Sequence, residues 1–524
     1  MHTVSALALS IVGLYAVQRF LEYRRAVAGI GNFPGYRQLF SPASLTANIV
    51  RRIRGGMGEA ILRGHDPFQE KGWDALTRVT VFPSTETFVE LADAGAIKEI
   101  TTYRARFPKP VHQYKILQVF GGNIVASEDE EWKRYRKISA PAFSEKNNKL
   151  VWDETVLIML DMFENVWKHA PEYTVDHCID VTLPIALFVI GVAGFGRRVS
   201  WTDDNHIPAG HTMTFKESLH IMSTDILLRV IFPRWATRFS KKLRHVYLGY
   251  DELDRYMFEM IESRRSAEKK EDRSDLFSSL MDAADEDSLG SSSKITDREL
   301  VGNTFIFLLA GHETTAHTLC FCFAYLALYP EEQEKLFAQI KTLMPDSKKP
   351  PASSIPAYEE MGSFTYSMAV FYETLRLQPP VTGIPKMSAE DTSVTVTSVT
   401  GERAQLPIPK STRIVINTPA LHRNPRYWSD PLTFKPERFL DPDWPRDAFV
   451  PFSAGPRACI GRRFFETEGI AILTMLISQY KVEIKDEPQF AGESFDERKS
   501  RVLASKPGLT TTPVRVPLTF KRRY

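Results

Sequence analysis

Residues 452–461 read FSAGPRACIG, and they contain the one cysteine of the chain whose neighbours ask for an explanation. Two glycines and a proline predict a loop whose backbone closely approaches another part of the molecule. The apolar pattern over residues 464–477 predicts a helix after this loop, so Cys459 would lie near a helix N-terminus. There the helix dipole and backbone N–H groups favour a thiolate over a thiol. A thiolate is a soft ligand for iron or copper, whereas an isolated buried cysteine is usually a small packed hydrophobe.

The same segment matches, at every fixed position, the heme-ligand signature F-x-x-G-x-R-x-C-x-G of the cytochrome P450 family. The chain therefore resembles a heme-thiolate monooxygenase, which is an oxidoreductase. The resemblance implies that Cys459 is the axial ligand of the iron in heme b (iron protoporphyrin IX), where a thiolate favours cleavage of the O–O bond. It also implies that Arg457 contacts a heme propionate. The implied fold is mainly α with small β-sheets (α+β), with a long central helix and the heme between that helix and the cysteine loop.

Two more motifs extend the resemblance along the chain. Glu373 and Arg376 match the family's E-x-x-R, in which the i, i+3 spacing places the carboxylate and the guanidinium on one helix face. Arg438 lies in a P-E-R-F segment between that motif and the cysteine loop. An isolated E-x-x-R is usually a solvated pair, but this order of motifs is specific. By resemblance, the three residues form a buried network that supports the heme-binding core.

Further heme contacts are implied upstream. Trp132 and Arg136 match the family's W-x-x-x-R, whose indole N–H and guanidinium contact a heme propionate. The planar fork and permanent charge of arginine suit it to a carboxylate. Lys386 stands where many family members carry arginine. Lysine offers the charge without the planar fork, and we expect heme retention to survive this replacement.

A long helix is predicted between Thr296 and Tyr329. Thr296 and Glu299 form a capping-box pattern, no proline follows until Pro330, and that proline ends the helix. Apolar residues cover nearly every face, so the helix should run through the middle of the fold. Further elements are predicted downstream: helices at 331–343 and 363–377, and strands at 392–396 and 412–417.

A polar break, AGHETT at residues 310–315, interrupts the long helix and resembles the family's A-G-x-[DE]-T-[TS]. The resemblance implies that Glu313 and Thr314 are the acid and alcohol pair that delivers protons during oxygen activation. A buried helical glycine costs up to ~1 kcal/mol relative to alanine, and threonine hydroxyls that bond back to carbonyls can bend a helix. Because these residues are unfavourable inside a helix, their presence favours a functional role for this segment. His312 and His317 are expected to be packing or solvent-facing residues rather than iron ligands.

The N-terminal residues 3–18 carry no charge and are strongly apolar, which predicts a membrane segment. As a helix they rise only ~24 Å, less than the ~30 Å hydrocarbon core, so spanning requires the residues up to Tyr23. A cleaved signal peptide is the alternative, but its cations precede the apolar run, whereas here Arg19, Arg24 and Arg25 follow it. This arrangement keeps the downstream chain in the cytosol.

We therefore expect residues 1–29 to form an N-terminal transmembrane anchor in the endoplasmic reticulum membrane and residues 30–524 to form a single cytosolic catalytic domain. The 66 lysines and arginines nearly balance the 64 aspartates and glutamates, so no basic field is present to bind nucleic acid. Four cysteines in 524 residues are too few for a disulfide scaffold, which favours a reducing compartment.

The chain contains no nucleotide-binding pattern, so electrons must come from another protein. The implied reaction is RH + O2 + 2 e− + 2 H+ going to ROH + H2O. By resemblance, NADPH is oxidised by a separate NADPH–cytochrome P450 reductase, and cytochrome b5 is a second candidate partner. We expect the docking face to draw on basic residues, which attract an acidic partner: Arg134, Arg136, Lys137, Arg457, Arg462 and Arg463.

The segments that line the substrate pocket in the family are largely apolar here, which favours a lipophilic terpenoid, steroid or aromatic substrate. These segments are 107–124, 215–235, 381–384 and 503–509, with Phe307 and Ala310. Apolar residues at 227–232 could dip into the bilayer and admit such a substrate. The overall pattern resembles fungal members, which suggests secondary metabolism or the oxidation of xenobiotics. Two alternatives stay open: an O2-independent isomerase or peroxygenase, which has no need of the acid and alcohol pair, and a non-catalytic heme-binding protein.

Overall fold

The computed structural model describes residues 2–41, 63–196, 201, 207–266, 275–285, 295–345 and 357–524. Within it the chain forms two units, each described by itself. Unit 1 consists of Met1–Pro110, Arg376–Thr433 and Asp443–Cys459, and unit 2 consists of Val111–Leu375, Phe434–Pro442 and Ile460–Tyr524. The expectation that residues 30–524 form one catalytic domain stays a prediction.

A five-stranded mixed sheet in the order β1-β2-β3-β8-β5 forms the centre of unit 1. The pairs β1–β2 and β3–β8 are parallel, whereas β2–β3 and β5–β8 are antiparallel. Val79, Val89 and Ile414 are fully buried, as β-branched residues on the covered face of a sheet should be. The strands of the sheet are β1 (Gly35–Phe40), β2 (Ala75–Phe82), β3 (Glu86–Leu91), β5 (Gly383–Met387) and β8 (Arg413–Asn417).

Short helices and a hairpin complete unit 1. Asp93 caps α5 by accepting a hydrogen bond from the backbone N–H of Ala96 at 2.9 Å, and α5 contacts the 3-10 turn Gly455–Arg457 of the cysteine loop. The hairpin pairs β6 (Thr392–Thr397) with β7 (Arg403–Ile408). The helices are α4 (Asp66–Lys71), α5 (Ala94–Thr102) and α15 (Thr418–His422).

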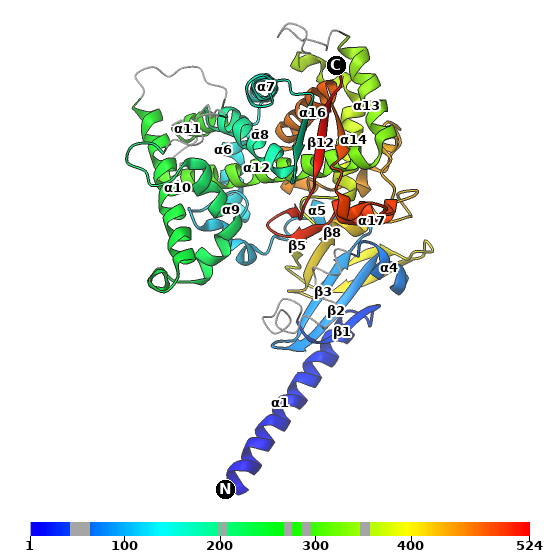
Figure 1. Ribbon diagram of the computed structural model, residues 1–524. Helices are drawn as coiled ribbons and strands as arrows, with labels where there is room; N and C mark the ends of the chain where they lie inside the picture. The colour runs from blue at the N-terminus through cyan, green and yellow to red at the C-terminus, as the bar shows by residue number, and fades with distance from the viewer. Residues whose placement is uncertain are drawn as a thin grey trace. The chain divides into compact units, whose positions relative to one another are not determined.

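Helix α1 (His2–Gly29) leads into β1 and is drawn in dark blue in Figure 1. Its apolar side chains are exposed, and they include Leu7, Leu9, Ile11, Val12, Leu14, Val17, Phe20 and Leu21. None of the helices in the described parts of the chain is apolar over a length sufficient to cross a membrane. The predicted transmembrane helix is therefore not confirmed. In α1 the apolar run soon reaches the ion pair of Arg19 and Glu22.

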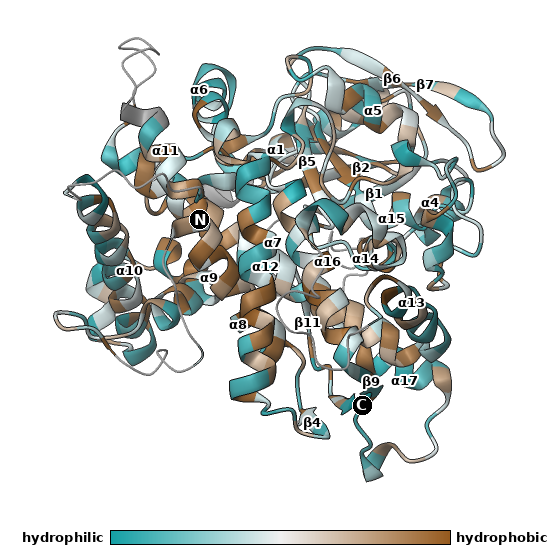
Figure 2. Ribbon diagram, turned by 90° about the horizontal axis from the view of Figure 1, so that it is seen from above, coloured by the Kyte–Doolittle hydropathy of each residue, from teal (hydrophilic) through white to brown (hydrophobic). Residues whose placement is uncertain are grey.

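Unit 2 holds most of the helices. Helices α12 and α8 pack against each other, and Figure 2 shows hydrophobic, brown segments alternating with hydrophilic ones along the helices. Helices α9 and α10 pack against each other. The helices are α6 (Asp129–Ser139), α7 (Glu145–Asp161), α8 (Ile179–Val189), α9 (Phe215–Ile231), α10 (Lys241–Arg265), α11 (Leu276–Asp285), α12 (Asp297–Leu328), α13 (Pro330–Leu343), α14 (Thr365–Leu377), which ends in unit 1, α16 (Arg462–Gln479) and α17 (Phe495–Val502).

Helix α12 confirms the predicted long central helix of this unit. Thr296 accepts a hydrogen bond from the backbone N–H of Glu299, whose side chain accepts one from the backbone N–H of Thr296, so the capping box is complete. The helix ends one residue before Tyr329, and Pro330 begins α13. Its side chains are buried on nearly all faces, and α8, α10 and α16 contact it. At Gly302 an added Cβ would lie 2.5 Å from the carbonyl oxygen of Gly122, so this close approach requires glycine.

Small sheets lie beside these helices. Strands β4 (Glu172–Val175), β12 (Leu518–Arg522) and β9 (Tyr480–Ile484) form an antiparallel sheet in that order. Strands β10 (Ser505–Pro507) and β11 (Thr511–Pro513) form a hairpin near the C-terminus, and β11 contacts α12. The downstream helices and strands predicted from the sequence are confirmed as α13, α14, β6 and β8.

Candidate active site

Cys459 lies at the end of a closed loop in unit 1. Its backbone N–H donates to the carbonyl oxygen of Phe452 at 2.8 Å, and the N–H of Ala458 donates to Gly455 at 3.0 Å. Gly455 has a φ of +66°, and an added Cβ would lie 2.3 Å from the backbone carbonyl oxygen of Thr101 in α5. Glycine is thus required both for the left-handed backbone and for the close packing of the loop on α5.

The cysteines differ in exposure. Cys459 is exposed, whereas Cys178, Cys320 and Cys322 are buried. Burial raises the pKa of Cys322 to about 12, and burial and a hydrogen bond with Cys178 raise the pKa of Cys320 well above its usual value. Both buried cysteines on α12 are therefore neutral thiols at neutral pH. Cys459 is the cysteine whose sulfur an external metal centre can approach.

Glu373 of α14 is fully buried and holds the segment that contains Arg438. Its Oε1 accepts a hydrogen bond from Arg438 Nε at 3.1 Å and another from the backbone N–H of Lys435 at 2.9 Å. The exposed fractions are 0% for the Glu373 side chain and 9% for Arg438. A buried carboxylate needs such partners, because an unpaired buried charge is costly.

Arg376 lies one turn later on α14 and is also fully buried. Within unit 1 its guanidinium donates to the carbonyl oxygens of His422 at 2.7 Å, Pro431 at 2.8 Å and Thr433 at 3.3 Å. These three hydrogen bonds fix the position of the chain at the end of α15 and after it. The sequence motif identified the buried arginine and the Glu373–Arg438 pair, but not these carbonyl partners. The supporting role of the three residues toward heme stays a prediction.

The residues expected near the propionates fall in both units. Trp132 and Arg136 lie one turn apart on α6 in unit 2, with Trp132 buried and Arg136 half-buried. Lys386 lies in β5 of unit 1, opposite Ile414 of β8, and is buried. Arg457 ends the 3-10 turn of the cysteine loop. Their contacts with heme stay predictions.

The polar break of α12 is an open place on a helix whose side chains are mostly buried. Ala310 is exposed, and Gly311 and Thr314 are half-buried. Thr314 donates its hydroxyl proton to the carbonyl oxygen of Ala310 at 2.7 Å. Thr315 donates in the same way to Gly311 at 3.0 Å. The open place is therefore bordered by the Thr314 hydroxyl oxygen, whose proton points back into the helix, so this oxygen can accept a further hydrogen bond. Thr315 is buried, and its hydroxyl also lies 3.2 Å from Oε2 of Glu468.

Glu313 points its carboxyl group toward the C-terminal turn of unit 2. Its Oε1 accepts a hydrogen bond from the hydroxyl of Thr510 at 3.1 Å. Its buried Oε2 has no hydrogen-bond partner among the described residues. Burial raises the pKa of Glu313 to about 7, and the bond from Thr510 partly opposes this increase. The group is therefore able to gain and lose a proton near neutral pH, which is what a proton donor requires.

The two histidines of α12 have defined partners. Nδ1 of His312 bonds to the carbonyl oxygen of Leu308 at 2.7 Å, and burial lowers its pKa to about 4, which agrees with a packing role. His317 is buried too, but its Nδ1 lies 2.8 Å from the hydroxyl oxygen of Thr510. The sequence missed this link between His317, Thr510 and Glu313, because no local pattern places residue 510 beside α12.

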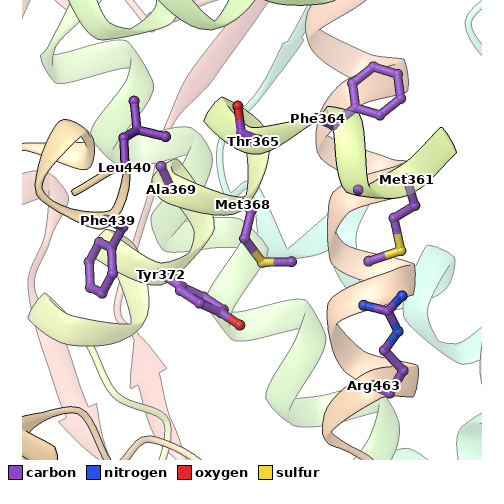
Figure 3. Close-up of a pocket in the computed structure, with 10 residues that line it drawn as sticks. Met361, Phe364, Thr365, Met368, Ala369, Tyr372, Phe439, Leu440 and Arg463 are labelled. Carbon is purple, nitrogen blue, oxygen red and sulfur yellow. The ribbon is translucent and has the colours of Figure 1, made fainter. Parts of the chain in front are cut away.

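A separate cavity of about 470 Å³ lies in unit 2 beside the first turn of α16. Figure 3 shows Met361, Met368 and Tyr372 at this cavity together with Arg463, whose guanidinium lies near Met361. The lining is mainly apolar and contains neither Glu313 nor Thr314. The cavity is therefore distinct from the open place on α12.

Comparisons with known proteins show which family the chain is similar to. The Cytochrome P450 family model matches residues 77–510. The chain is 51% identical over 527 residues to "Cytochrome P450 monooxygenase 124" of Postia placenta, covering 100% of both chains. It is 28% identical to "Cytochrome P450 monooxygenase ORF6" of Penicillium roqueforti, covering 75% of this chain and 73% of that protein. The crystal structure of the cytochrome P450DA heme domain has the same fold, with a TM-score of 0.74, 20% identity, and coverage of 94% and 99%.

The chain belongs to the cytochrome P450 family. The predictions of the family, of the P450 fold and of the enzyme class, a monooxygenase among the oxidoreductases, are confirmed. The family implies a heme bound through a cysteine thiolate. The residues present fit this group: the exposed thiol of Cys459 ends a loop whose backbone is held against α5, and Gly455 allows that approach.

Proposed function

We propose that the protein inserts one oxygen atom from O2 into a lipophilic organic substrate of the terpenoid, steroid or aromatic class. NADPH–cytochrome P450 reductase would supply the electrons from NADPH, with cytochrome b5 as a second donor. The observation that carries the proposal is the exposure of Cys459 at the end of the closed signature loop, while the other three cysteines are buried.

In this proposal heme b, when bound, supplies the activation of O2, and the chain holds it in place. Cys459 would bind the iron through its thiolate, and the hydrogen bond from its own N–H to Phe452 holds the loop that carries the sulfur. Cationic and indole donors would hold the propionates: Arg457, Trp132, Arg136 and Lys386. Glu373, with Arg376 and Arg438, stiffens the chain segments around α14 by the buried bonds described above.

Glu313 and Thr314 handle protons at the open place of α12. Glu313 holds a proton near neutral pH because burial raises its pKa to about 7. Thr314 has committed its own proton to Ala310, so its oxygen accepts a hydrogen bond from a water or a substrate hydroxyl. The two residues therefore have complementary roles, one as proton donor and the other as acceptor that positions the group to be protonated.

A membrane association is proposed from two apolar surfaces. The first is the set of exposed apolar side chains of α1, which would lie in or on the endoplasmic reticulum membrane with the catalytic part in the cytosol. The second, in unit 2, we call the α9 patch; its members are Leu227, Val230, Ile231, Phe232, Trp235 and Phe239, and all are exposed. Exposed apolar patches of this kind are typical of membrane or protein interaction sites.

Docking of the reductase is proposed at the first turn of α16. Arg462 and Arg463 are exposed there, although Glu466 accepts a hydrogen bond from Arg462 Nε at 2.7 Å. Arg134 is less available because it is paired with Glu299. The cation of Arg463 beside the apolar cavity suits an acidic partner that also presents an apolar side chain.

The deciding experiment is the absorption spectrum of the reduced, CO-bound protein. A thiolate-ligated heme gives a strongly red-shifted Soret band, and Cys459→Ala should abolish this band, whereas Cys322→Ala should retain it. NADPH- and reductase-dependent O2 consumption then separates a monooxygenase from the O2-independent alternatives. If the wild-type protein binds heme without a thiolate signature, the proposed function is wrong.

A further inference from the structure

A chain of hydrogen bonds leads from Glu313 through the C-terminal turn of unit 2 to His317. The hydroxyl of Thr510, in the turn before β11, donates to Glu313 Oε1 at 3.1 Å. The same hydroxyl oxygen lies 2.8 Å from Nδ1 of His317, which is one helical turn after Glu313 on α12. The exposed fractions are 9% for Glu313 and 6% for each of the other two residues. One hydroxyl group thus joins a buried carboxyl group to a buried imidazole.

We propose that Thr510 and His317 are positioning residues that form a proton relay to Glu313, in which the Thr510 hydroxyl passes a proton from the His317 imidazole to the Glu313 carboxylate. This inference rests on the proposed function, because the proton that reaches Glu313 is one of the two that the monooxygenase reaction consumes.

The transfer balances at each atom. A threonine hydroxyl has one proton to donate and lone pairs that accept. While Glu313 is ionised, Thr510 donates to Oε1 and accepts the Nδ1 proton of His317. When Nε2 of His317 takes a proton, the Nδ1 proton moves to the Thr510 oxygen and the Thr510 proton moves to Glu313 Oε1. One proton has entered, Glu313 has become neutral, and His317 is again neutral with its proton on Nε2.

The local electrostatics favour this direction. Burial is the main cause that lowers the pKa of His317 to about 4, and His312, His177 and Lys506 make smaller contributions in the same direction. Burial raises the pKa of Glu313 to about 7, and Thr510 is the neighbour that opposes this increase. A proton therefore moves readily from the imidazole to the carboxylate. His317 does not retain it, as a relay group must not.

A purely structural role explains the arrangement less well. Burial of a carboxyl group and an imidazole is costly, and an apolar pair of similar volume would pack α12 against the C-terminal turn without that cost. Glu313 Oε2 has no hydrogen-bond partner among the described residues, so the relay ends at a carboxyl group with one oxygen available for onward transfer.

The test compares Thr510→Val, which removes the hydroxyl but keeps the shape, with Thr510→Ser, which keeps the hydroxyl. The heme-loaded wild-type protein and both variants are titrated by infrared spectroscopy, using the carboxyl C=O band that disappears in Glu313→Gln. Loss of the donated hydrogen bond should raise the midpoint of this band in Thr510→Val by roughly half to one pH unit, while Thr510→Ser stays at the wild-type midpoint.

His317→Phe tests the outer end of the relay. It leaves the Thr510–Glu313 bond in place, so the Glu313 titration should change little. NADPH- and reductase-supported O2 consumption should nevertheless fall about tenfold or more, most strongly above pH 7, where Glu313 is ionised and must be reprotonated. Because His317→Phe does not depend on the folding of Thr510→Val, it keeps the test valid if that variant is unstable.

The relay is refuted if Thr510→Val titrates as Thr510→Ser does, or if His317→Phe consumes O2 with the wild-type rate and pH profile. Either result, obtained together with a normal CO-bound spectrum, leaves the proposed function intact. Absence of that spectrum from the wild-type protein would instead reject the proposed function, so the two failures are distinguishable.

Discussion

Replacement of Gly455 by alanine should detach the cysteine loop from its support. The added Cβ would lie 2.3 Å from the carbonyl oxygen of Thr101, which belongs to the backbone of α5 and cannot rotate away. Overpacking of this kind typically costs roughly 1–3 kcal/mol, and the left-handed backbone at a φ of +66° costs alanine about 1–2 kcal/mol more. Together these effects destabilise the loop by roughly 2–5 kcal/mol.

A matched control separates the two contributions. Gly401, in the turn between β6 and β7 of the same unit, has a φ of +93° but has nothing within 4 Å of an added Cβ. Gly401→Ala should therefore show the backbone cost alone, as a decrease of a few degrees in the apparent unfolding temperature with full heme content.

The assay measures thermal unfolding by circular dichroism and heme content by the reduced, CO-bound spectrum. Gly455→Ala should lose most of the thiolate-type band even where its helical signal is retained, because the strain acts on the loop that carries Cys459. The reasoning is refuted if Gly455→Ala matches Gly401→Ala in both heme content and unfolding temperature.

Three other changes have defined outcomes. Between the usual carboxyl pKa of 4.5 and about 7, Glu313 stays protonated in the folded protein and is ionised in the unfolded chain. The free energy of unfolding should therefore fall by roughly 3 kcal/mol as the pH rises through this window, and Glu313→Gln should reduce this pH dependence. Chemical denaturation of both proteins measures it, and the same pH dependence in the variant and the wild-type protein would contradict the prediction. Glu373→Ala removes the buried carboxylate that accepts hydrogen bonds from Arg438 and from the backbone N–H of Lys435, and it should cost about 3–5 kcal/mol. Lys98→Ala breaks an ion pair whose side chains are 65% and 61% exposed, so it should change stability by less than ~1 kcal/mol; similar unfolding temperatures for both variants would contradict the value given to the buried pair. Ile231→Glu in the α9 patch should weaken binding to phospholipid vesicles roughly tenfold, and the CO-bound spectrum should not change. If the variant co-sediments with the vesicles to the same extent as the wild-type protein, this patch is not a membrane contact.

Much of the local structure follows from short-range patterns. Thr296, Glu299 and Pro330 define the ends of α12, because a capping box and a proline act on the backbone within a few residues. The signature loop is equally local, since its glycines, arginine and cysteine are contiguous in the chain. Motif order then identified the family without any knowledge of packing.

Long-range pairings were not readable in this way. Strand β3 pairs with β8, so Val89 lies opposite Ile414. The local sequence of either segment does not predict which strand it pairs with. The carbonyl partners of Arg376 come from a stretch whose conformation depends on α15 and the loop after it. The difference between an exposed Cys459 and the buried cysteines of α12 likewise arises only after helices cover one another.

The sequence by itself determined the family, the cysteine loop and the polar break of α12, because each is encoded by neighbouring residues whose spacing sets their geometry. The tertiary structure alone decided that Thr510 meets Glu313 and His317, and that burial brings the pKa of Glu313 to about 7. Burial and hydrogen bonding between segments almost 200 residues apart depend on how the whole chain packs, and that packing excludes water from the carboxyl group.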